Sequence, residues 1–131
     1  MSICADYCLL CEAHAESMGR HSLINVFDGL NCPRFPAQLP RCFLVARLRG
    51  DPGEYAGRLR FMAGSEDKDV VPPLPEIRIR IEEGVRPAAT AVFELAGLPL
   101  PREGFYSFVL EFEGHRAAEC ELIARLVKAE G

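Results

Sequence analysis

Hydrophobic and polar residues alternate along much of this chain with a period of two. In residues 77–81 three isoleucines alternate with two arginines. Residues 108–113 repeat the pattern, with Phe108, Leu110 and Phe112 on one side of an extended chain. Successive side chains of a β-strand point to opposite faces, so this alternation predicts strands that are buried on one face.

Eight segments of this kind are separated by turn residues, among which Asp51-Pro52-Gly53 is a strong turn signal. Residues 121–129 also contain good helix formers; we expect a final strand there, with a helix as the alternative. We predict an all-β fold, specifically an antiparallel two-sheet β-sandwich of about eight strands in a single domain spanning residues 1–131. The predicted segments are residues 3–11, 20–29, 41–50, 55–64, 76–84, 89–97, 105–113 and 115–127.

Composition narrows the class of protein. With 49% hydrophobic and 26% charged residues, the chain is typical of a folded globular protein. Its net charge of −4 argues against general nucleic-acid binding, which favours a basic surface. No segment approaches the roughly 20 apolar residues that span a bilayer, and the first residues lack the charge pattern of a signal peptide. We therefore expect a cytoplasmic protein whose six cysteines stay reduced.

Three of the cysteines, Cys4, Cys8 and Cys11, have a spacing similar to the cluster-binding motif of radical S-adenosylmethionine enzymes. On a regular strand, however, Cys4 and Cys8 would share a face about 13 Å apart, and Cys11 would point to the other face. Because thiolates so arranged cannot converge on one cluster, we expect packing rather than a cofactor. The alternative is a metal- or thiol-dependent enzyme that uses Cys8, Cys11 and His14.

Arginines occur two residues apart in three of the predicted strands, which places each pair on one face. Acidic residues follow the same spacing in the last two strands, so the surface is predicted to carry a basic ribbon and an acidic ribbon. The simpler interpretation is a solvated sheet face with cross-strand ion pairs. The alternative is a face that binds a small molecule, an anion or a complementary protein. The candidate binding residues on these strands are Arg47, Arg58, Arg78 and Arg80.

Several short motifs together resemble a family of small, uncharacterised bacterial proteins that form an all-β domain of unknown function. Many relatives lack the cysteines of the first strand, which weakens the metal interpretation. The resemblance supports the fold and supplies no chemistry. The motifs are Ala5-Asp6-Tyr7, Asn25-Val26-Phe27-Asp28, Phe35-Pro36 with Pro40, and Pro52-Gly53-Glu54.

If a surface within these motifs is functional, the candidate residues are Asp6, Tyr7, Asp28 and Phe35. The simpler interpretation is that Asp28 stabilises a turn and that Phe35 closes one end of the core. Taken together, the sequence favours a non-enzymatic protein that acts through protein–protein contacts. A homodimer is expected, because it would cover an exposed edge strand.

Overall fold

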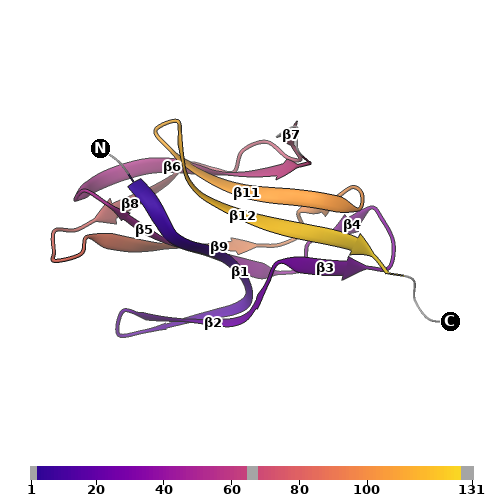
Figure 1. Ribbon diagram of the computed structural model, residues 1–131, viewed down its shortest axis with the longest axis horizontal. Helices are drawn as coiled ribbons and strands as arrows, with labels where there is room; N and C mark the ends of the chain where they lie inside the picture. Colours follow the sequence, from indigo (N-terminus) through magenta and orange to yellow (C-terminus); the bar gives the residue numbers. More distant parts are fainter. Residues whose placement is uncertain (1–2, 65–67, 128–131) are drawn as a thin grey trace.

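The computed structural model describes residues 3–64 and 68–127, and this part of the chain contains β-strands and no helix (Figure 1). The predicted all-β fold is therefore confirmed. Among these residues no helix is long and apolar enough to cross a membrane. In chain order the strands are β1 (Ile3–Ser17), β2 (Arg20–Phe27), β3 (Gly29–Cys32), β4 (Ala37–Gln38), β5 (Cys42–Gly50), β6 (Gly53–Ala63), β7 (Lys68–Asp69), β8 (Ile77–Ile81), β9 (Ala88–Leu95), β10 (Pro99–Leu100), β11 (Gly104–Phe112) and β12 (His115–Leu126).

The strands form three sheets. A four-stranded sheet has the order β2-β1-β5-β9, and a six-stranded sheet has the order β3-β12-β11-β6-β7, with β8 also paired to β6. The third sheet contains only β4 and β10. The described residues thus form twelve strands in three sheets, which differs from the predicted eight strands in two. The difference arises in the connections, where short segments such as 37–38 and 99–100 pair with each other although prolines flank them.

The core lies between the inner faces of the two larger sheets. Leu10 and Leu44 from the four-stranded sheet and Phe61 and Phe108 from the six-stranded sheet belong to one cluster of buried side chains. The ring of Phe61 stacks on that of Phe108, with 4.6 Å between the centroids. The predicted alternation is confirmed for β11, where Phe108 and Phe112 are buried in this cluster.

A β-bulge in β1 changes which side chains face the core. The pairing of β1 with β5 shifts between Ala5 and Tyr7, so Asp6 is an extra residue. The bulge reverses the alternation: Ala5 and Cys8 both pack against the core, whereas Cys4 is exposed. The expectation that Cys4 and Cys8 share a face is therefore wrong, because it assumed a regular strand.

The final strand β12 extends to Leu126, which confirms the predicted strand as far as that residue and excludes the helix there. Residues 128 and 129 lie outside the described part of the chain. β12 pairs with β11 on one side and, from Ile123 to Leu126, with the short strand β3 in parallel on the other. The parallel pairing forms because the chain leaves the four-stranded sheet after β2 and enters the edge of the six-stranded sheet as β3 (Figure 1).

Two buried tyrosines form hydrogen bonds to the backbone of loops at the ends of the core. The Tyr106 hydroxyl donates a hydrogen bond of 2.5 Å to the carbonyl oxygen of Arg102, four residues earlier. The Tyr55 hydroxyl donates a bond of 2.6 Å to the carbonyl oxygen of Asp51. Because both tyrosine rings are buried, these bonds join the β5–β6 and β10–β11 connections to the packed interior.

We predict that Gly57→Ala destabilises the protein, because strand β6 has no room for a side chain at this position. A Cβ atom on Gly57 would lie 2.5 Å from ring atoms of Phe112 and 2.7 Å from the Glu111 carbonyl oxygen. The expected loss is about 1–3 kcal/mol in the free energy of unfolding, measured by urea denaturation. The control is Gly84→Ala, whose Cβ would meet no atom within 4 Å and which should change stability by less than about 0.5 kcal/mol. Equal effects of the two substitutions would contradict this account of the packing.

Candidate functional site

The outer face of the four-stranded sheet is apolar at its centre. Strand register places six side chains there in two adjacent rows, on the side opposite the core. One row runs across β1, β5 and β9, and the other across β2, β1 and β5. We refer to these six residues as the apolar face: Leu9, Val45 and Val92 in the first row, and Val26, Cys11 and Phe43 in the second.

The apolar face combines exposed and covered side chains. Leu9, Val26 and Val92 are exposed to 37%, 52% and 39%, respectively. Val45 and Cys11 lie between them and are fully buried, although both are outside the core cluster. A covered apolar centre with exposed apolar neighbours is the composition typical of a contact surface rather than of a solvated sheet.

Charged residues flank the apolar face at both ends. At one end the carboxylate of the bulge residue Asp6 forms an ion pair with Arg49, with 2.6 Å between Oδ1 and Nε. Its other oxygen lies 4.0 Å from the Nε atom of Arg47. Tyr7 is directly opposite Arg47 in the register of β1 and β5. At the other end Arg41 forms an ion pair with Glu94. Both ends therefore carry positive and negative side chains, with one arginine in excess at the end near Asp6.

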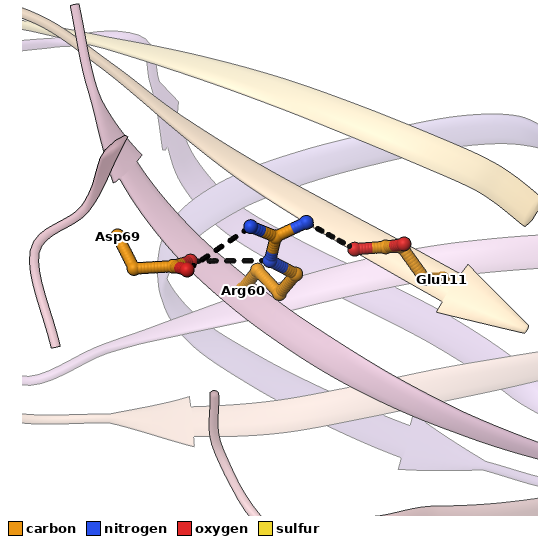
Figure 2. Close-up of polar contacts among 3 residues, drawn as sticks. All are labelled: Arg60, Asp69 and Glu111. Atoms are coloured by element: carbon orange, nitrogen blue, oxygen red, sulfur yellow. Dashed lines mark hydrogen bonds and ion pairs between the residues drawn. The ribbon is translucent and has the colours of Figure 1, made fainter. Parts of the chain in front are cut away.

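The outer face of the six-stranded sheet combines apolar side chains, namely Met62, Val109 and the exposed Phe105, with a charged group around Arg60. Figure 2 shows this charged group. The Arg60 guanidinium donates two hydrogen bonds to Asp69, of 3.1 and 3.0 Å, and one of 2.8 Å to Glu111. These carboxylates, Asp69 first, raise the pKa of Arg60 above its usual value. All three nitrogen atoms of the guanidinium thus donate to these two carboxylates.

The predicted arginine candidates are divided between the two sheets. Arg47 is on the four-stranded sheet, whereas Arg58, Arg78 and Arg80 are on the six-stranded sheet. The single basic ribbon predicted from their spacing does not form, because β5 and β6 belong to different sheets. Acidic residues interleave with the arginines, since Arg58 lies opposite Glu111 in the register. This arrangement agrees with the simpler interpretation of cross-strand charge pairs.

The other predicted candidate residues contact neighbouring charged residues, the core or the backbone of an adjacent strand. Arg78 is 4.0 Å from Glu76, and Arg80 lies opposite Glu54. Phe35 packs against the core, as the simpler interpretation expected. The carbonyl oxygen of Asp28 accepts a hydrogen bond of 2.8 Å from the Ile123 amide, at the start of the β3–β12 pairing.

The structure brings three of the predicted candidates together: Asp6, Tyr7 and Arg47 lie beside the apolar face. It separates the alternative metal ligands. Cys8 faces the core, Cys11 belongs to the apolar face, and His14 makes a 2.8 Å hydrogen bond to His21. Residues 3–64 and 68–127 contain no group of three or more His, Cys, Asp or Glu side chains placed to hold a metal ion.

Sequence reasoning missed the apolar face, although a signal for it exists. The run Cys42-Phe43-Leu44-Val45-Ala46 is apolar at five successive positions, so both faces of β5 are apolar. Continuous apolar runs indicate strands that are covered on both faces.

The architecture defines an all-β protein whose four-stranded sheet has an apolar outer face and whose six-stranded sheet has a mixed outer face with a charged group around Arg60. The chain belongs to the family of unknown function DUF6941, which it matches over residues 6–125. No curated protein gives a significant match.

Among solved structures, the chain is similar to the β-glucosidase of Listeria innocua. The complex with gluconolactone matches with a TM-score of 0.50 and 10% identity over 94% of this chain and 17% of the enzyme. The complex with glucose gives 0.49 and 10% over 78% and 15%. The chain thus spans about a sixth of the enzyme, and at this identity the likeness concerns the fold alone.

We predict that Arg60 and Glu111 are energetically coupled more strongly than Arg78 and Glu76. The first pair is 2.8 Å apart and its side chains are exposed to 29% and 22%, whereas the second is 4.0 Å apart and more exposed. In double-mutant cycles with glutamine replacements, we expect a coupling of about 1 kcal/mol for the first pair and less than about 0.5 kcal/mol for the second. Similar couplings in urea unfolding would show that the Arg60 contacts are ordinary solvated pairs.

Proposed function

We propose that the protein is non-enzymatic, acts in the cytoplasm through protein–protein contacts, and makes these contacts with the apolar face. The observation that carries the proposal is that the apolar face exposes three apolar side chains around a fully buried apolar centre. The apolar face leaves Leu9, Val26 and Val92 in water unless another surface covers them.

The apolar face is suited to binding by its rigidity. Val26, Val45 and Val92 are β-branched and lie on paired strands, so they lose little conformational freedom in a complex. Removing apolar surface from water contributes roughly 25 cal/mol for each Å² that is buried. A surface that is already ordered retains more of this gain as affinity.

We propose that the occupant is a second copy of the chain. The end of the apolar face near Arg47, Arg49 and Asp6 has one excess positive charge, whereas the opposite end carries the Arg41–Glu94 ion pair. A twofold axis in the plane of the interface and perpendicular to the strands would bring Arg47 of each chain toward Glu94 of the other. Glu94 would then lie between Arg41 of its own chain and Arg47 of the other, beside a shared apolar centre.

The binding of a small anion has less support. Each arginine discussed above as a binding candidate either forms an ion pair or lies opposite a carboxylate in the register: Arg47 with Asp6, Arg58 with Glu111, Arg78 with Glu76 and Arg80 with Glu54. An anion would have to compete with these carboxylates. The cytoplasmic location is supported by the six cysteines, all of which are free thiols.

We predict that Val92→Asp converts a dimer to a monomer, because it places a charge in the first row of the apolar face. Light scattering coupled to size-exclusion chromatography should give a dimer mass for the wild type and a monomer mass for the variant. The control is Val85→Asp, a valine-to-aspartate change at a fully exposed residue away from the sheet, which should leave the dimer intact. Circular dichroism confirms that both variants fold.

Two results would overturn parts of this proposal. A wild type that is monomeric at all concentrations would remove the second copy as the occupant. A dimer that Val92→Asp leaves unchanged would show that the apolar face is not the contact surface.

A further inference from the structure

Two strands leave one side of the core only partly closed. β1 pairs with β2 from Leu10 onward, so the part of β1 before Leu10 lies at the edge of its sheet. β12 pairs with β3 only from Ile123 onward, so the part before Ile123 lies at the edge of the other sheet. These two strand segments approach each other across the core. Each contributes one inward-facing cysteine, Cys8 from β1 and Cys120 from β12.

A cavity of about 440 Å³ opens onto this side of the molecule, and both cysteines line it. Its apolar wall includes Leu10 and Phe27, and its acidic part is formed by Asp28, Glu119 and Glu121. Cys120 is 8% exposed and Cys8 is half-buried. A small oxidant can therefore reach the sulfur atoms through the cavity.

The two thiols are neighbours. Cys8 and Cys120 line the same cavity, and the interaction between their side chains shifts the pKa of each. The interaction with Cys8 lowers the pKa of Cys120, against the opposite effect of burial and of the charges of Asp28 and Glu121. The same interaction together with burial raises the pKa of Cys8. Cys120 is thus the thiol that ionises first, with Cys8 holding a proton beside it.

We propose that Cys8 and Cys120 form a redox-active dithiol site that small neutral hydroperoxides oxidise to a disulfide joining the two large sheets. The Cys120 thiolate attacks a peroxide oxygen, the O–O bond breaks, and the products are Cys120 sulfenic acid and hydroxide, which takes up a proton to give water. The Cys8 sulfur then attacks the Cys120 sulfur, the S–O bond breaks, and a second water leaves with the Cys8 proton. Two thiols and one hydrogen peroxide yield one disulfide and two waters.

The acidic residues of the cavity determine which oxidant is favoured. Asp28, Glu119 and Glu121 repel anions, so an uncharged peroxide should react faster than the anionic disulfide of glutathione. Two of the four other cysteines show how the surroundings differ. Cys42 is buried in the core, which raises its pKa to about 11, and Cys4 is exposed on the outer side of β1. Leu9 and Val26 of the apolar face also line the cavity, so the proposed dimer would narrow the path to the two thiols.

We predict that one equivalent of hydrogen peroxide removes two titratable thiols from the wild type. Peptide mapping should show Cys8 joined to Cys120, with the mass lowered by two hydrogen atoms. Cys8→Ser should accumulate sulfenic acid at Cys120, trapped by a dimedone reagent, and Cys120→Ser should form neither product. Cys4→Ser is the control and should form the disulfide like the wild type.

Because a Cys→Ser variant can lose stability, the folded state of each is checked by circular dichroism, and the peptide map of the wild type provides a test that needs no variant. A disulfide that maps to any other pair of cysteines would overturn the proposal. Sulfenic acid that forms equally at Cys4 and Cys120, or an equal rate with oxidised glutathione, would also contradict it.

Discussion

The β-bulge at Asp6 determines what each side chain of β1 does. The extra residue reverses the alternation between Ala5 and Tyr7, so Cys8 and Leu10 face the core, while Leu9 faces outward. Ala5 and Cys8 are three residues apart, so on a regular strand they would point to opposite faces. Without the bulge, one of them would therefore point away from the core. The charge of Asp6 is satisfied on the surface by Arg49.

The proposed contact surface and the proposed dithiol site therefore depend on the same backbone irregularity. Leu9 supplies the apolar face and its neighbour Cys8 supplies the dithiol site, on opposite sides of a single strand. Both features also depend on β1 being central in its sheet over Leu10 and Cys11 but at the edge before Leu10. The change occurs because β2 leaves β1 after Phe27 and continues as β3 in the other sheet.

The sequence predicted those parts of the fold that follow from local alternation. The inward side chains of β8 and β11, such as Ile81 and Phe108, follow directly from a period of two. The bulge could not be predicted, because Asp6 differs in no local respect from a polar residue on an outer face. The short pairings of β4 with β10 were also missed, since they join segments about 60 residues apart that contain or adjoin prolines.

The site was harder to predict than the fold because it depends on which strands are neighbours. Arg47 and Arg58 have the same local pattern, and only the topology separates them onto different sheets. Cys8 and Cys120 are distant in the sequence and come together only because β1 and β12 face each other across the core. The local spacing of Cys4, Cys8 and Cys11 is similar to a cluster-binding motif, whereas the neighbour of Cys8 in the structure is Cys120, from the last strand of the chain. The chemistry of a cysteine in an all-β protein is thus determined by the packing of its sheets more than by the motif around it.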